Sequence, residues 1–195
     1  VVIVPIYRTT EEQVNVAAAC EQMMNELRAV GVRVHLDDRP DVRPGAKFFK
    51  WEQRGVPLRI EIGPRDLAQQ LCTLVVRSAA EGQERKRPII LAEVVSEVTR
   101  ALEQYRLTLI QRAKAYMAAQ THEMQFESVA AFGARLDATN GFYRAAWCGG
   151  THCEELLTEY KGGIRCILDA QPVAGARCFG CNKAPLNVVI IAKGY

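Results

Sequence analysis

Four cysteines in the last third of the chain have the spacing of metal ligands. Four residues separate Cys148 from Cys153, two separate Cys178 from Cys181, and 24 lie between the two pairs. Cysteine pairs spaced in this way are typical of a Cys₄ zinc site, in which the thiolates fill the coordination sphere and leave no position for a substrate. The sequence therefore predicts a structural zinc site, with unrelated thiols as the alternative.

The remaining thiols and one histidine have to be weighed against this set. His152 could replace Cys153 as a ligand, but the four cysteines already complete the site. Cys20, Cys72 and Cys166 lie inside apolar helix or strand patterns and are predicted to be packed. An odd total of seven cysteines, three of them in such patterns, favours a reducing compartment over a disulfide framework.

A second group of residues, in the segment 37–67, combines positive charge with aromatic rings. Arg59 and Glu61 alternate with apolar residues, so on a strand they share one face. With Glu52 they could simply form a surface ion-pair network. The functional alternative is that Arg and Glu side chains hydrogen-bond to base edges while Phe48 stacks on an unpaired base, as in the reading of single-stranded RNA.

The charge distribution weakly supports a polyanionic partner. Residues 39–87 carry 11 Lys/Arg against 6 Asp/Glu, a net charge of +5, whereas the remainder carries 14 against 16, a net charge of −2; the chain total is +3. A solvated basic surface without a partner is the alternative. Within this segment, Phe49 and Trp51 are predicted to lie on a short helix, 46–53, and to pack into the core.

The pattern of the first ninety residues predicts a small mixed sheet with helices. Residues 1–7 form an apolar run typical of a buried strand. A helix follows, capped by Thr9 or Thr10 with Glu12 or Gln13 completing a capping box, and Gly31 is placed to end it. Strands are predicted at 32–36, parallel to the first, at 58–62 and at 71–77, followed by a charged turn at 78–87. The fold class is α/β with four or five strands.

A long helix, 90–119, is predicted to lead into a second, α+β domain. Its elements are a helix at 126–136 and strands at 141–147, 163–168 and 187–192. We expect one domain over 1–102 and another over 103–195. The chain has no apolar run of the ~18 residues needed to cross a membrane. It starts without Met, inside a strand, and is expected to be a fragment.

Two sets of residues, taken together, resemble a known family. The segment from Asp37-Asp-Arg through Lys47-Phe and Trp51-Glu to Gly55-Val-Pro-Leu-Arg-Ile-Glu-Ile-Gly-Pro-Arg-Asp-Leu67 is similar to the anticodon-binding domain of prolyl-tRNA synthetases. The cysteine series, Arg165-Cys-Ile and the terminal Ala192-Lys-Gly-Tyr195 resemble the zinc-binding C-terminal domain of the archaeal/eukaryotic-type branch of that family. The resemblance covers essentially the whole chain in collinear order.

This resemblance implies roles for individual residues. Phe48 would stack on an anticodon base, and Glu52 and Arg59 would contact the two guanines shared by proline anticodons. The remaining expected anticodon contacts are Arg65, Asp66 and Lys86, with Arg85 as the alternative to Lys86. The C-terminal Tyr195 would reach toward the active site of the full enzyme.

The resemblance also implies partners and a setting. The full enzyme would be a cytoplasmic, homodimeric proline–tRNA ligase with no membrane association. Its catalytic domain, which uses ATP and Mg²⁺ to attach proline to tRNA(Pro), would lie upstream of this chain. The chain alone would bind tRNA and structural zinc without catalysing the reaction.

Two other functions have to be considered. The sequence also departs from the family pattern at two places. A stand-alone regulatory protein could use the same domain pair to sense tRNA. A flavodoxin-like ligand-binding module would need a glycine-rich phosphate loop after the first strand, but Arg8-Thr-Thr-Glu-Glu12 follows instead. The departures are Phe49-Lys50 before the tryptophan and the turn at 77–82, where the family usually has Arg-Arg-Asp-Thr-Gly.

Overall fold

The computed structural model describes residues 1–78, 82, 84–125 and 128–194. The chain forms two compact units, Val1–Gln111 and Arg112–Tyr195, and the division falls inside the helix α4 (Val94–Ala119). They are called unit 1 and unit 2 and are described separately. The predicted domain boundary after residue 102 lies in the same helix and stays a prediction.

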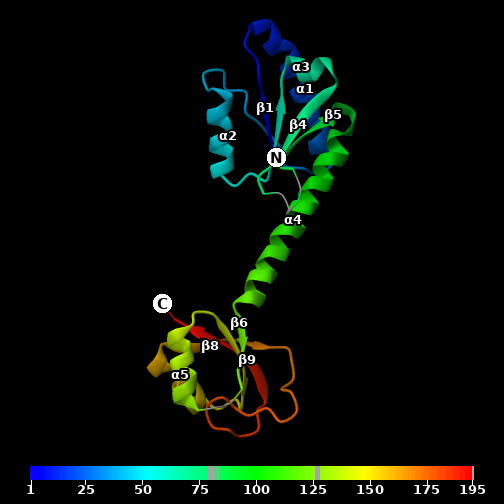
Figure 1. The fold of residues 1–195 in the computed structure, drawn as a ribbon. Coiled ribbons are helices and arrows are strands. Elements are labelled where there is room, and N and C mark those ends of the chain that lie inside the picture. The colour runs from blue at the N-terminus through cyan, green and yellow to red at the C-terminus, as the bar shows by residue number, and fades with distance from the viewer. Residues whose placement is uncertain (79–81, 83, 126–127, 195) are drawn as a thin grey trace. The chain divides into compact units, whose positions relative to one another are not determined.

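Unit 1 is built on a five-stranded mixed sheet in the order β2-β1-β3-β4-β5. The strand β1 (Val2–Pro5) pairs in parallel with β2 (His35–Leu36) and with β3 (Leu58–Ile62). Antiparallel pairs join β3 to β4 (Leu71–Val76) and β4 to β5 (Lys86–Ile90). Figure 1 shows this sheet with its helices on both sides. The predicted mixed α/β class is confirmed.

The strand–helix–strand start of unit 1 also agrees with the prediction from the sequence. All four residues of β1 are buried. Thr9 is the N-cap of the helix α1 (Thr10–Ala29). Its side chain accepts from the Glu12 N–H, and the Glu12 carboxylate accepts from the Thr9 N–H, which completes the predicted capping box. Gly31, with φ +82°, follows the end of the helix. The strand β2 is shorter than predicted, but it is parallel to β1 as expected.

The alternation of side chains gives the two faces of this sheet different partners. One face packs its core side chains against α1 and the start of α4, through buried residues such as Ile60, Leu74, Leu27 and Val98. On the other side, the helix α2 (Pro44–Gln53) packs against β1. The short helix α3 (Pro64–Ala68) follows β3. The polar side chains of β3 therefore lie on the face that α2 borders.

The segment around residue 90 differs from the prediction. Lys86–Ile90 forms β5 instead of the end of a charged turn and the start of a helix, and α4 begins at Val94 after a 3₁₀ turn, Leu91–Glu93. Pro88 has no N–H to donate, but β5 is an edge strand, where proline is tolerated. Antiparallel pairing with β4 therefore decides the conformation here.

Unit 2 contains a four-stranded sheet in the order β6-β7-β9-β8. Its strands are β6 (Thr121–Glu123), β7 (Phe142–Trp147), β8 (Gly162–Leu168) and β9 (Asn187–Lys193), and only β6 and β7 pair in parallel. The helices α5 (Val129–Ala138) and α6 (Thr151–Glu155) precede β7 and β8 along the chain, the latter with a 3₁₀ turn, Thr158–Tyr160. The α+β prediction is confirmed, although the sequence did not reveal β6.

The core of unit 2 joins the sheet to the cysteine segments. Phe132 and Leu136 of α5 and Tyr143 of β7 are buried together with Cys153 and Cys178. In the part of the chain that the structure describes, no helix is both long and apolar enough to span a membrane.

Candidate functional site

A buried carboxylate organises the polar face of the unit 1 sheet. Glu61 on β3 is 5% exposed, and its two oxygens have separate partners. Arg59 Nε donates to Glu61 Oε1 at 2.9 Å, and Lys86 Nζ on β5 donates to Glu61 Oε2 at 2.7 Å. The register explains the meeting, because Glu61 is opposite Thr73 on β4 and Lys86 is opposite Val75, so both point to the α2 side.

Arg59 also contacts an aromatic ring of α2. Its guanidinium carbon lies 4.2 Å from the centroid of the Phe48 ring, within the range of a cation–π contact. Phe48 is half-buried, and the Arg59 side chain is 15% exposed. Glu61 and Phe48 thus hold the guanidinium from two sides, which fixes its position at the surface.

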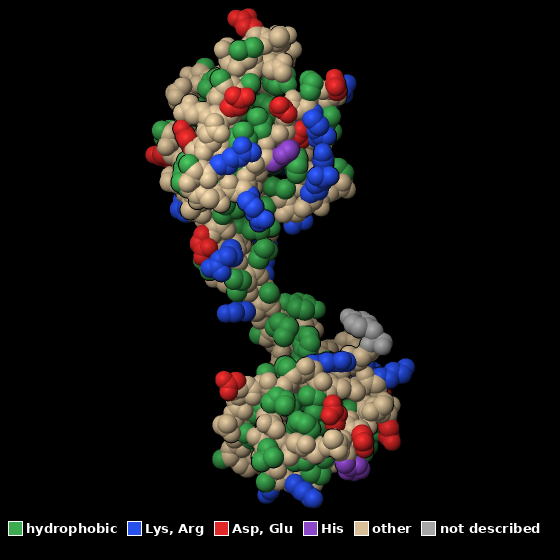
Figure 2. Space-filling model, turned by 180° about the vertical axis from the view of Figure 1, so that it is seen from behind, with side chains coloured by type: hydrophobic (Ala, Val, Ile, Leu, Met, Phe, Trp, Pro, Cys, Tyr) green, Lys and Arg blue, Asp and Glu red, His purple; other side chains and the backbone are tan. Residues whose placement is uncertain are grey.

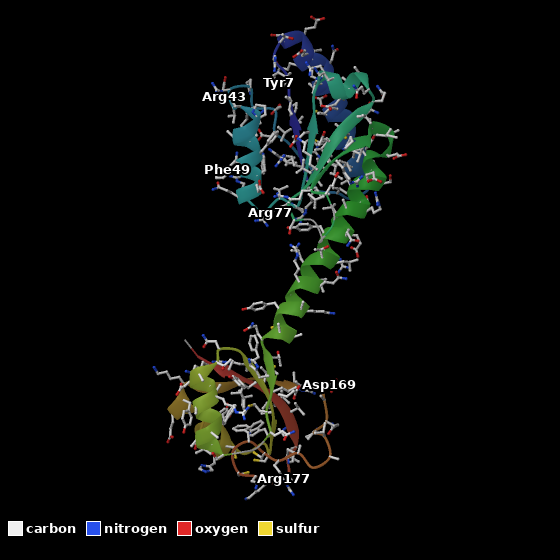
Figure 3. The ribbon with its side chains drawn as sticks, viewed as in Figure 1. Tyr7, Arg43, Phe49, Arg77, Asp169 and Arg177 are labelled. Atoms are coloured by element: carbon white, nitrogen blue, oxygen red, sulfur yellow. The ribbon has the colours of Figure 1, made fainter. Side chains whose placement is uncertain are left out.

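Glu52, at the end of α2, forms a looser group with two further arginines. Arg85 donates to Glu52 Oε1 at 2.8 Å, and Arg77 Nε donates to the Glu52 backbone oxygen at 3.1 Å. The hydrogen bond and the charge of Arg85 lower the pKa of Glu52 below its ordinary value, with smaller contributions from Arg59 and Arg77. Glu52, Arg59, Arg77 and Arg85 line one small hollow. Figure 3 shows Arg77 at this end of unit 1.

Two of the expected anticodon residues lie elsewhere in unit 1. Arg65 and Asp66 belong to α3, beyond the carboxyl end of β3, whereas Arg59 is near its start. Asp66 Oδ2 accepts from the Gly63 N–H at 2.9 Å and so caps α3, and Arg65 is exposed. The structure therefore brings together Phe48, Glu52, Arg59 and Lys86, but not Arg65 and Asp66.

The four cysteines of the predicted metal site meet in unit 2. Their Sγ atoms all lie within 4.8 Å of one another. The distances from Cys148 to Cys153, Cys153 to Cys178 and Cys148 to Cys181 are 3.7, 3.8 and 3.6 Å. A tetrahedral site with Zn–S bonds of ~2.3 Å requires sulfurs ~3.8 Å apart. The cluster therefore has the dimensions of a Cys₄ metal site.

The backbone favours a thiolate at Cys178, whereas burial and the neighbouring thiols raise the pKa of Cys153. Burial raises the pKa of Cys178, but hydrogen bonds from the backbone of Gly180, Cys181 and Cys148 outweigh it and lower the pKa to about 7. A Cβ on Gly180 would lie 2.7 Å from the Cys153 Cβ, so a larger residue there would displace the ligand. In contrast to Cys178, burial raises the pKa of Cys20 and Cys72 in unit 1 to about 12, as for packed, unreactive thiols.

Two comparisons with protein families connect these two regions. Residues 1–101 match the family described as "Anticodon binding domain", and residues 129–195 match "Prolyl-tRNA synthetase, C-terminal". The first match contains the polar sheet face of unit 1, and the second contains all four cysteines.

The chain belongs to the prolyl-tRNA synthetase family.

Related proteins agree with this assignment along the whole chain. It is 36% identical to the proline–tRNA ligase of Cenarchaeum symbiosum, 35% to that of Mycobacterium leprae and 33% to that of Thermococcus kodakarensis, each over 100% of this chain. The chain spans only about 40% of the length of these relatives: 39%, 40% and 40%, respectively.

A solved structure of the family has the same fold. It is the prolyl-tRNA synthetase of Cryptosporidium parvum, crystallised with L-proline and AMP, which superposes with a TM-score of 0.83 at 29% identity. The match covers 100% of this chain and 40% of that protein.

Predictions about four individual residues of this family member have different outcomes. Phe49 is 63% exposed, so its predicted core position is wrong, whereas Trp51 is half-buried. Cys166 is exposed and not packed, because the register of β8 shifts between Ile164 and Cys166 on this edge strand. Tyr195 lies outside the described residues, so its predicted position stays a prediction.

The sequence analysis missed the buried group that positions α2. Asp37 is 1% exposed and accepts from Arg39 at 2.7 Å and from Trp51 Nε1 at 2.6 Å, while Lys47 Nζ donates to its backbone oxygen at 3.0 Å. The hydrogen bonds from Arg39, opposed by burial and reinforced by Trp51, hold the pKa of Asp37 well below its ordinary value. An aspartate directly after a strand, with Lys and Trp on the next helix, was the available signal.

Proposed function

We propose that unit 1 recognises the anticodon of tRNA(Pro) within a proline–tRNA ligase. The observation that carries this proposal is the polar face of the sheet, where Phe48, Arg59 and Glu52 are exposed or half-buried beside one another. The family match makes the expected ligand an RNA anticodon. The names of the relatives favour a ligase over a stand-alone tRNA-sensing protein.

The chemistry of the face suits guanine. A guanidinium can donate two hydrogen bonds to guanine O6 and N7, and a carboxylate can accept from the guanine N1–H and N2–H groups. Arg59 is already oriented by Glu61 and Phe48, so little conformational freedom is lost when it binds. The ring of Phe48 can stack on a base with the side that Arg59 does not cover.

The two carboxylates on this face have different tasks in this proposal. The Glu52–Arg85 pair is exposed on both sides, at 47% and 55%, and such pairs contribute little stability, so Glu52 can exchange Arg85 for a base. Glu61 is buried between Arg59 and Lys86 and remains with them. Glu61 is then a positioning residue, and Lys86, 61% exposed, supplies positive charge for the RNA backbone. Arg65 and Asp66 on α3 would contact the RNA separately.

For unit 2 we propose a structural zinc ion held by Cys148, Cys153, Cys178 and Cys181. Four thiolates are the ligand set that zinc prefers in closed sites. When bound, the metal would supply folding stability rather than catalysis, because the four ligands leave no position for a substrate.

The remaining proposals concern the rest of the enzyme and the residue of this chain that would act on it. The catalytic domain, with its ATP and Mg²⁺, and a homodimeric assembly are assigned by resemblance to the family. Tyr195 would act at that active site. Deleting Tyr195 from the full enzyme should lower the rate of proline activation, measured by pyrophosphate exchange, with tRNA affinity unchanged. Weakened tRNA binding alone would make Tyr195 a structural residue of unit 2.

The decisive experiment measures binding of this chain to two transcripts at one stated salt concentration. One is tRNA(Pro), and the other carries replacements of the two anticodon guanines. A contact to each guanine worth about 1–3 kcal/mol predicts at least a ten-fold weaker affinity for the altered transcript. Equal affinity would mean that the face binds RNA without reading the anticodon.

A further inference from the structure

An aromatic ring on α2 lies at the surface, where the core cannot use it. Phe49 is 63% exposed, although its neighbours Phe48 and Trp51 on the same helix are both half-buried. Figure 3 shows Phe49 on the side of α2 that faces away from the sheet. Neither the core nor the ion pairs of the polar face account for a phenylalanine at this position.

Helix geometry places Phe49 beside the proposed anticodon site. Residues three and four apart are neighbours on a helix surface. Phe48 is four residues before Glu52, and Phe49 is three residues before it, so Glu52 lies between the two rings. A base held by Glu52 could therefore stack on Phe48, and the nucleotide next to it would lie within reach of Phe49.

The charges around Phe49 favour RNA as the occupant. Arg43 and Arg54, both exposed, cap the two ends of α2, and Lys50 is half-buried on it, against the single acidic residue Glu52. Lys47 is buried against Asp37 and does not belong to this surface. In Figure 2, acidic side chains lie mostly toward the top of unit 1, and Lys and Arg lie below them. Aromatic rings set among cations form the stacking surfaces of proteins that bind single-stranded nucleic acids.

We propose that Phe49 is a second stacking surface, which holds the nucleotide next to the one that Glu52 contacts. This inference rests on the proposed anticodon recognition and adds to it a contact of a different kind. Every base has a flat face to stack, so Phe49 would strengthen binding without distinguishing one base from another. Glu52 and Arg59 would supply the discrimination.

The test compares variants of this chain for binding to tRNA(Pro) and to the transcript with altered anticodon. Phe49→Ala should weaken binding to both transcripts by about the same factor, at least five-fold. Phe49→Trp should retain the affinity, and Phe49→Leu, which is apolar but has no ring, should lose as much as Phe49→Ala. Val14→Ala, at a 66% exposed apolar position on α1, is the matched control and should bind like the unaltered chain.

A spectroscopic measurement locates the contact. With 2-aminopurine in the anticodon loop, the unaltered chain should change the fluorescence at one nucleotide, and Phe49→Ala should remove that change. Normal binding by Phe49→Ala, or full affinity of Phe49→Leu, would overturn the stacking proposal while anticodon recognition stands. If the unaltered chain binds both transcripts equally, anticodon recognition fails, and a loss with Phe49→Ala would then mark a non-specific contact and not the neighbour of a read base.

Discussion

The polar face of unit 1 and the thiol cluster of unit 2 differ in how they are held. The four cysteines come from two short segments and are buried or half-buried, and three of their Sγ–Sγ distances are 3.6–3.8 Å. The polar face instead assembles residues from α2, β3 and β5, and its Glu52–Arg85 ion pair and the Lys86 side chain are exposed. In our proposal one site is closed and serves the fold, whereas the other is open and binds a ligand.

This difference predicts opposite consequences of mutation. Removing a ligand from a closed site removes folding energy, because metal binding and folding are coupled. Removing an exposed partner from an open site mainly affects binding, since water replaces most of the lost interaction. The following variants test this contrast, from the largest expected effect to the smallest.

The largest effect is expected from Cys153→Ser. The chain should contain about one zinc per molecule, and this variant should lose it and unfold unit 2 at a lower temperature than unit 1. Structural zinc contributes about 10–16 kcal/mol in isolated zinc-finger peptides. Metal analysis and thermal unfolding followed by circular dichroism, with and without chelator, measure both effects.

Cys166→Ser is the matched control, because Cys166 is exposed and outside the cluster. It should keep the metal and the unfolding temperature. Disulfide bonds among the four clustered cysteines in the reduced protein would contradict the zinc site.

The next effect concerns Asp37, below the open face. Asp37→Asn removes the negative charge of the carboxylate that accepts two hydrogen bonds from Arg39. The substitution should lower the free energy of unfolding of unit 1 by about 2 kcal/mol at pH 7. Because the pKa of Asp37 is depressed in the folded state, its contribution is complete above the unfolded pKa of about 3.9 and is lost as pH falls below it. Urea unfolding between pH 7 and pH 3 should therefore show the gap between variant and unaltered chain shrinking below pH 4.

Asp38→Asn provides the control, since Asp38 is exposed and adjacent in sequence. A gap that stays constant down to pH 3 would mean that the charge of Asp37 is not what stabilises α2.

Arg59→Ala should act on binding. The loss of a guanidinium contact predicts about 1–3 kcal/mol weaker binding to tRNA(Pro) and relaxed discrimination at one anticodon guanine. Titration with transcripts that differ at single anticodon positions measures this, and Arg59→Lys separates the charge from the geometry. An equal loss for every transcript would make Arg59 a phosphate contact.

The smallest effect on stability is expected from Arg85→Ala. Its partner Glu52 is exposed, so the unfolding temperature should not change measurably. Affinity for RNA should fall, and the dependence of binding on salt should become weaker, because one cation is lost from the interface. A clear loss of stability would show that the open face also serves the fold.

The sequence anticipated local features better than those that depend on strand pairing. The capping box of Thr9 and Glu12 was correct because its partners are three residues apart. The four cysteines meet as expected, because the two members of each pair are only a few residues apart along the chain. By contrast, Lys86–Ile90 was assigned to a turn and a helix, since its pairing partner β4 lies a full loop away along the chain.

The burial of single side chains also could not be predicted from the sequence. Phe49 and Cys166 have residue types that usually pack, yet both are exposed. Phe49 is exposed because α2 turns its Lys47 and Trp51 side toward Asp37, and Cys166 because of a register shift on an edge strand.

Taken by itself, the sequence determined the two kinds of chemistry: thiolates with metal-ligand spacing, and a strand with Arg59 and Glu61 on one face. Both depend on separations of a few residues, which the backbone geometry of turns and strands converts directly into proximity. Only the tertiary structure decided that Glu61 would hold Lys86, and that Asp37 would fix α2 beside them. Those contacts join residues 14 to 25 positions apart, and they form only when the sheet register and the packing of α2 have brought distant segments together.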